Sequence, residues 1–142
     1  MTAHHAIENL IFTYAARVDE GDFAAVGELF AHGTFAGGAP ATGRAAVERY
    51  FRDTLVVYPD GTPRTRHLTT NVRVEVDEAA GTATAHSYWT ALQAVPGLPL
   101  QPIASGYYDD RFERADGSWR FVERRPHVAL AGDLSHHLKI AA

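Results

Sequence analysis

Apolar side chains recur at helical spacing through the first third of the chain and at alternating positions later. In residues 3–19 they lie three or four positions apart, which predicts an amphipathic helix with Thr2 as its N-cap. Asp22 can cap a second, shorter helix, and a third helix is predicted over residues 43–56. Residues 33–42 are rich in glycine, alanine and proline and predict a turn region with at most short strands.

After these helices the spacing of the apolar side chains changes to every second residue. Residues 68–76 alternate between apolar or small side chains and polar ones, which predicts a strand with His67 and Asn71 on its polar face. Turn signals separate three further predicted strands, over residues 82–94, 102–114 and 118–130. Helices followed by an antiparallel meander predict an α+β fold whose sheet packs one face on the helices. Strong curvature would enclose a pocket on the other face.

Composition narrows the class of protein. The chain has 142 residues, 46% of them hydrophobic, which predicts one domain over residues 1–142. Cysteine is absent, which excludes a disulfide framework and a thiolate nucleophile and is compatible with a reducing compartment. The net charge is -4 and arginines alternate with acidic residues, so a nucleic-acid or anionic-membrane surface is disfavoured. No signal-like start and no apolar run of about 20 residues is present, and a cytoplasmic protein is expected.

Several blocks spread along the chain resemble successive segments of a SnoaL-like domain of the nuclear-transport-factor-two-like superfamily. They are YAARVDEGD (14–22), ELF (28–30), RHLTTN (66–71), GYYDD (106–110), GSWRF (117–121) and GDLS (132–135). The resemblance covers nearly the whole chain. It implies a cone-shaped α+β barrel in which three N-terminal helices pack on a strongly curved, mostly antiparallel sheet.

Within that superfamily, an Asp at the end of the first helix and a His at the start of the first long strand resemble the pattern of scytalone dehydratase and hexachlorocyclohexane dehydrochlorinase. The resemblance implies that Asp19 and His67 form a catalytic dyad. Imidazole in water has a pKa of about 6.5, so its neutral form can accept a proton near neutral pH, and a carboxylate can hold its tautomer. Taken alone, Asp19 also fits a solvated helix end and His67 an ordinary strand histidine.

Five other residues are candidates for substrate binding. Tyr14 is similar in place to a hydrogen-bond donor of the ketosteroid isomerase branch, and also fits a packed aromatic residue. Asn71 shares the predicted face of His67, and also fits a residue that satisfies strand backbone. His86 and Tyr88 share one strand face and provide either a second acid or a polar lining. The resemblance to the dehydrochlorinase places Arg124 in the active site, where it could bind an anionic group.

These residues lead to three hypotheses. The first is a cofactor-independent dehydratase, isomerase or cyclase that acts on a hydrophobic small molecule, with no metal and with a homodimer as the expected assembly. The second is a noncatalytic binding or assembly module of the same fold. The third is an epoxide hydrolase, for which no second carboxylate is found. The adjacent pairs His4-His5 and His136-His137 fit surface histidines better than metal ligands, and residues 132–138 can cover the mouth of the pocket.

Overall fold

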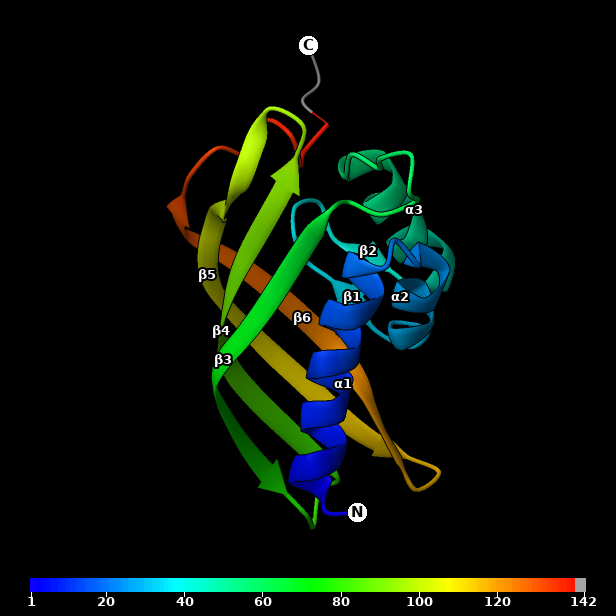
Figure 1. Ribbon diagram of the computed structural model, residues 1–142. Helices are drawn as coiled ribbons and strands as arrows, with labels where there is room; N and C mark the ends of the chain where they lie inside the picture. The colour runs from blue at the N-terminus through cyan, green and yellow to red at the C-terminus, as the bar shows by residue number, and fades with distance from the viewer. Residues whose placement is uncertain (140–142) are drawn as a thin grey trace.

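The computed structural model describes residues 1–139 and contains three helices and one six-stranded sheet (Figure 1). In chain order the elements are α1 (Ala3–Asp19), α2 (Phe23–Leu29), β1 (Thr34–Phe35), β2 (Ala41–Thr42), α3 (Arg44–Thr54), β3 (Thr65–Asp77), β4 (Thr82–Val95), β5 (Leu98–Ala115) and β6 (Ser118–Ala131). The predicted α+β class and the order of its elements are therefore confirmed.

Both predicted helix caps are present. The side chains of Thr2 and Asp22 each accept a hydrogen bond of 3.1 Å from a backbone N–H in the first turn of the helix that follows. Gly21 follows the end of α1 with φ +75°, and a Cβ there would lie 2.1 Å from the carbonyl oxygen of Gly61. Only glycine fits this turn, which places Asp19 at the last position of α1, against the start of β3.

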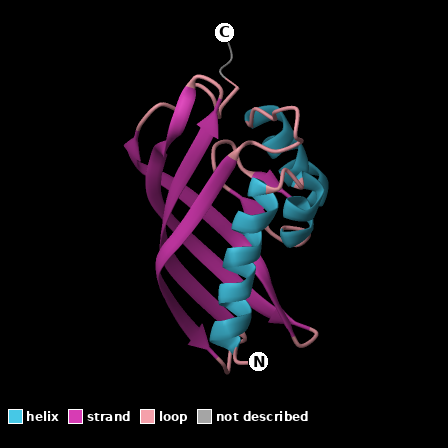
Figure 2. Ribbon diagram, in the orientation of Figure 1, coloured by secondary structure: helices cyan, strands magenta, loops and turns pink. Residues whose placement is uncertain are grey.

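The strand order is β2-β1-β6-β5-β4-β3, antiparallel throughout except for the parallel pair β1 and β6. The sheet curves without closing, so β2 and β3 are its edges, and the helices cover one side of it (Figure 2). Stacked and edge-to-face aromatic rings fill the space between the helices and the sheet. The ring centroids of the stacked pair Phe30 and Phe121, for example, lie 4.8 Å apart. Within residues 1–139, none of the helices combines the length and apolar character needed to span a membrane.

A β-bulge interrupts the alternation predicted for β3. Thr70 pairs with Tyr88 and Arg73 with His86, so two residues of β3 stand opposite a single residue of β4. The bulged residue Asn71 has φ +52°, a left-handed conformation that asparagine tolerates better than most residues. Because one residue is inserted, the inward face changes from the odd-numbered positions to the even-numbered ones. The prediction of a single apolar face over residues 68–76 was therefore wrong.

The connection between β4 and β5 is tighter than expected. Residues 95–101 were expected to connect the strands predicted at 82–94 and 102–114, but Val95 already pairs with Leu98 across a two-residue turn in which Gly97 has φ +87°. Proline followed by a glycine with positive φ is the sequence of a type II turn. Strand β5 consequently starts four residues earlier than predicted.

Candidate active site

A cavity of about 250 Å³ lies between the helices and the inner face of the sheet. Its wall is mainly apolar, has His67 as one of its polar members and includes six aromatic residues, Tyr14, Phe35, Tyr50, Phe51, Trp89 and Tyr108. The expectation of a pocket on the sheet face opposite the helices was therefore wrong, because the curvature of the sheet hollows the helix-facing side. The volume is below the 300–1,000 Å³ that is usual for ligand pockets, which suits a small ligand.

The structure brings His67 and Asp19 together. The Nδ1 atom of His67 lies 2.6 Å from Oδ1 of Asp19, and only 10% and 11% of the two side chains are exposed. The contact joins the last residue of α1 to the third residue of β3. Asp19 is therefore not a solvated helix end, and His67 is a hydrogen-bonded strand histidine that does not lie on the surface.

Two further hydrogen bonds fix the carboxylate of Asp19. Oδ1 accepts from the hydroxyl of the buried Thr65 at 2.8 Å, and Oδ2 accepts from the backbone N–H of His67 at 2.7 Å. A carboxylate beside Nδ1 favours the tautomer with the proton on that nitrogen, which leaves Nε2 of His67 as a hydrogen-bond acceptor. Since the ring lines the cavity, Nε2 is the atom that can accept a proton there.

Tyr14 lies in the cavity wall, where it was expected, and is 4% exposed. Burial, together with the neighbouring Tyr108, raises the pKa of Tyr14 well above its ordinary value. Burial likewise raises the pKa of Tyr108 to about 12. Both hydroxyls therefore stay protonated at neutral pH. Tyr14 donates toward the hydroxyl of Tyr108, which leaves the proton of Tyr108 for a ligand. The sequence motif GYYDD contained Tyr108, but nothing in it indicated which of its two tyrosines points inward.

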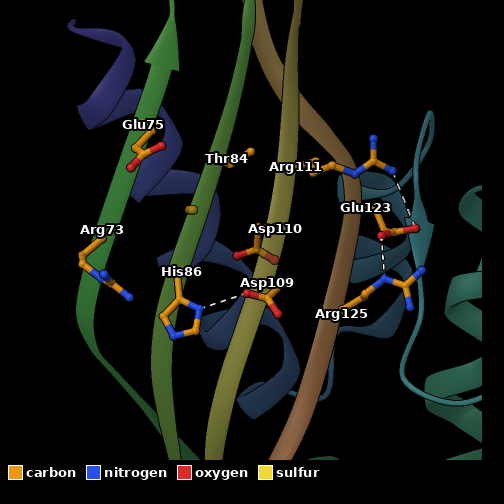
Figure 3. A pocket seen from close by; sticks show the side chains of 10 residues that line it. Arg73, Glu75, Thr84, His86, Asp109, Asp110, Arg111, Glu123 and Arg125 are labelled. Atoms are coloured by element: carbon orange, nitrogen blue, oxygen red, sulfur yellow. Dashed lines mark hydrogen bonds and ion pairs between the residues drawn. The ribbon is translucent and has the colours of Figure 1, made fainter.

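Three of the candidate residues face away from the cavity. Asn71 is exposed at the bulge, so it does not share the inner face of His67. His86 and Tyr88 do share one face of β4, as predicted, but it is the outer face of the sheet. There His86 contacts Asp109 at 2.9 Å in a charged hollow of about 550 Å³ (Figure 3). We assign the candidate site to the smaller inner cavity, because apolar walls and a few convergent polar groups are typical of ligand sites.

Arg124 is buried behind the cavity wall and is not part of it. Its guanidinium donates two hydrogen bonds to the buried carboxylate of Asp110, at 2.8 and 3.0 Å, and lies 3.5 Å from the ring centroid of Tyr108. The expectation that Arg124 binds an anionic group of the substrate is therefore corrected. Arg124 points inward from β6, but the inward residue Asp110 on the neighbouring strand already neutralises its charge.

Comparison with known proteins agrees with this fold. The family model described as a SnoaL-like domain matches residues 1–125. The chain belongs to the SnoaL-like domain family. No curated protein matches its sequence at a significant level.

Several solved structures are similar to this SnoaL-like chain. One is Rv3472 of Mycobacterium tuberculosis, a protein of unknown function. Its sequence identity is 28%, its TM-score is 0.72, and the match covers 87% of this chain and 70% of that one. An NTF2-like protein of Novosphingobium aromaticivorans with a cystatin-like fold has 25% identity, a TM-score of 0.72 and coverage of 88% and 80%. A second protein of that organism, provisionally named a scytalone dehydratase, has 21% identity, a TM-score of 0.71 and coverage of 92% and 86%. At 21% identity, the last similarity shows the fold alone.

A second histidine of this SnoaL-like domain reaches the cavity and was missed in the sequence. His137 follows β6 in the C-terminal segment, is 7% exposed, and its ring centroid lies 6.4 Å from that of His67. The expected surface position for His137 was wrong, whereas the expectation that residues 132–138 cover the pocket is supported by Leu134, His137 and Leu138 in its wall. The available signal in the sequence was the spacing of two leucines, Leu134 and Leu138, which lie three residues before and one residue after His137.

The polar groups of the cavity wall are hydroxyls, an indole N–H and two imidazoles. No carboxylate belongs to the wall formed by the described residues, since Asp19 is turned to His67 and Asp110 to Arg124. Within residues 1–139, no three His, Cys, Asp or Glu side chains converge in a way that could hold a metal ion. This set of groups can bind and protonate or deprotonate a small ligand.

Proposed function

We propose that this SnoaL-like protein is a cofactor-independent acid–base enzyme of the dehydratase, isomerase or cyclase type. One observation carries the proposal: the ring of His67 is held at Nδ1 by Asp19 at 2.6 Å, and the same residue lines a cavity that contains six aromatic side chains. A general base needs an orienting partner and access to a substrate proton, and this arrangement supports both.

In the proposed reaction, Nε2 of His67 removes a proton from a carbon next to a carbonyl group. The C–H electron pair moves toward the carbonyl oxygen, and Asp19 stabilises the imidazolium that forms. The protonated hydroxyl of Tyr108, which itself accepts from Tyr14, is a donor for the developing negative charge. Return of the proton to a departing hydroxyl gives dehydration, and return to another carbon gives isomerisation. Attack of the enolate carbon on a second carbonyl gives cyclisation, and the alkoxide that forms takes the proton back from His67.

The wall also limits the substrate. Six aromatic side chains and a volume of about 250 Å³ favour a flat, largely apolar molecule of one or two rings that carries few charges. Because the arginine expected at the site is paired with Asp110, we propose neutral ketones or hydroxyketones instead of carboxylates as substrates.

The test measures proton removal directly. Purified protein is incubated in deuterium oxide with a panel of cyclic ketones and β-hydroxyketones, and deuterium uptake at the carbon next to the carbonyl is followed by NMR and mass spectrometry. We expect catalysed exchange, with dehydration where a β-hydroxyl is present, and a loss of about 10²–10⁴-fold in His67→Gln. A folded His67→Gln protein with the full exchange rate would exclude His67 as the base.

Two other functions predict different outcomes. A noncatalytic binding module would bind members of the panel without exchange, in both the wild type and His67→Gln. An epoxide hydrolase needs a water molecule held by carboxylates, and the cavity wall formed by the described residues contains no carboxylate. We therefore place proton abstraction first.

We further propose that the protein is a homodimer that associates through the outer face of the sheet. Two neighbouring rows cross this face, and their charges are unequal: Arg73, His86, Asp109 and Arg125 in one, and Glu75, Thr84, Arg111 and Glu123 in the other (Figure 3). A two-fold axis that runs between the two rows and parallel to them would place the first row of one copy against the second row of the other copy. Sedimentation equilibrium tests this: Arg73→Glu should shift the protein toward monomer, whereas a wild type that is already monomeric would reject the proposal.

A further inference from the structure

The segment that carries His137 is firmly attached to the body of the protein. The backbone N–H of Val56 donates to the carbonyl oxygen of His137 at 2.8 Å, and that of Lys139 donates to Thr54 at 2.8 Å. The preceding carbonyl, of His136, accepts from the side chain of Gln93 at 3.2 Å. The ring of His137 is therefore held in the cavity wall by backbone contacts that do not involve its own nitrogens.

Those nitrogens lack partners among residues 1–139. Nδ1 of His137 is fully enclosed and neither accepts nor donates a hydrogen bond, and the residue as a whole is 7% exposed. A buried N–H without a partner is tolerated less well than a buried lone pair, so the ring proton belongs on Nε2. An Nε2–H group of a cavity-lining ring is a donor available to a ligand.

Burial keeps this ring neutral. Burial lowers the pKa of His137 to about 4, the nearby His67 acts in the same direction, and Asp19 opposes them. When His67 accepts a proton, a second positive charge at a ring-centroid distance of 6.4 Å becomes still less favourable. At neutral pH the ring thus has one N–H donor and no charge.

We infer that His137 is a second catalytic group of the proposed site, whose Nε2–H binds the oxygen of the carbonyl group beside the carbon that His67 deprotonates. This inference rests on the proposed function and adds a residue to it. As the C–H bond breaks, the proton goes to Nε2 of His67 and the electron pair moves to the carbonyl oxygen. His137 donates a hydrogen bond to that enolate oxygen throughout, forms no covalent bond and keeps its own proton.

A phenol is a suitable probe, because its oxygen resembles an enolate oxygen on a flat ring. Binding of 4-nitrophenol and of nitrobenzene, which lacks the hydroxyl, is measured by absorbance and calorimetry for the wild type, His137→Leu and His137→Gln. We expect His137→Leu to weaken 4-nitrophenol binding about tenfold and to leave nitrobenzene binding unchanged, with partial recovery in His137→Gln, which retains an N–H donor. The matched change His136→Gln, at a neighbouring side chain outside the cavity wall, should alter neither affinity.

The same variants separate this inference from the proposed function. In the deuterium-exchange assay we expect His137→Leu to slow exchange about a hundredfold, as loss of an oxyanion donor does. Equal loss of both probes in His137→Leu would make His137 an apolar wall residue and overturn the inference, as would unchanged 4-nitrophenol binding or no binding by the wild type. Full exchange in His137→Leu together with lost exchange in His67→Gln would reject the role of His137 and keep the base. Absence of exchange in the wild type would reject the proposed function itself.

Discussion

Replacing His137 with glutamine should reduce the loss of folding stability that the protein suffers as the pH falls toward 4. In the folded protein, burial lowers the pKa of His137 from its ordinary value of 6.5 to about 4. The unfolded chain therefore binds a proton at this residue at a higher pH than the folded protein does. Stability that depends on a neutral His137 is fully present above pH 6.5, decreases below it, and is lost once the pH falls below about 4.

The size of the effect follows from the two pKa values. Their difference, about 2.5, corresponds to about 3 kcal/mol when both states are fully protonated. At about pH 5 the unfolded state is largely protonated and the folded state is not, and the loss relative to neutral pH is about 2 kcal/mol. This is a measurable part of the roughly 5–15 kcal/mol that stabilises a typical domain.

Urea unfolding of the wild type and of His137→Gln, at about pH 7.5 and about pH 5, measures the difference. Titrations common to both proteins cancel, so the wild type should lose about 2 kcal/mol more than the variant between the two conditions. His136→Gln is the control and should keep the pH dependence of the wild type, because the buried ring of His137 is unchanged in it. Parallel pH profiles for the wild type and His137→Gln would show that His137 is not a buried neutral residue, and the argument for its Nε2–H donor would fail with it.

Thr65→Val removes the 2.8 Å hydrogen bond to Asp19 and should cost about 1–2 kcal/mol in urea unfolding while slowing exchange less than His67→Gln does; an unchanged stability would contradict the role given to Thr65. Arg124→Met leaves Asp110 buried without its partner and should cost about 3–5 kcal/mol, whereas the double variant Arg124→Met/Asp110→Leu should recover a large part of this; additive losses would refute the coupling. Asn71→Gly suits the positive φ of the bulge and should change stability by less than about 1 kcal/mol with no effect on exchange; a tenfold slower rate would show that the outer position of Asn71 has been misjudged.

Local signals in the sequence were sufficient for most of the fold. The caps at Thr2 and Asp22 act on amides three residues away, and the turn at residues 116–117 joins neighbouring strands, so each is encoded where it occurs. The bulge at Asn71 was not predictable in the same way. The extra residue does not alter the kinds of residue that make up the strand. Only the pairing of β3 with β4 reveals that the inward face changes from odd-numbered to even-numbered positions.

The candidate site shows the same division. The resemblance to SnoaL-like domains selected His67, Asp19 and Tyr14, because their motifs lie at the ends and faces of predicted elements. Which charged residue reaches the cavity depended on its neighbours across the sheet: Arg124 points inward but is paired with Asp110. His137 carried no motif, and its role depends on a C-terminal segment that returns to α3.

Apart from the dyad, which only the resemblance to SnoaL-like domains implied, the sequence by itself determined the α+β class and the order of helices and strands. These properties depend on local spacing and capping. Only the tertiary structure decided that Asp19 and His67 touch, that Arg124 is neutralised, and that His137 faces the same cavity as His67. Each of these joins residues on different elements, and the curvature and register of the sheet, which set such distances, arise from the packing of the whole chain.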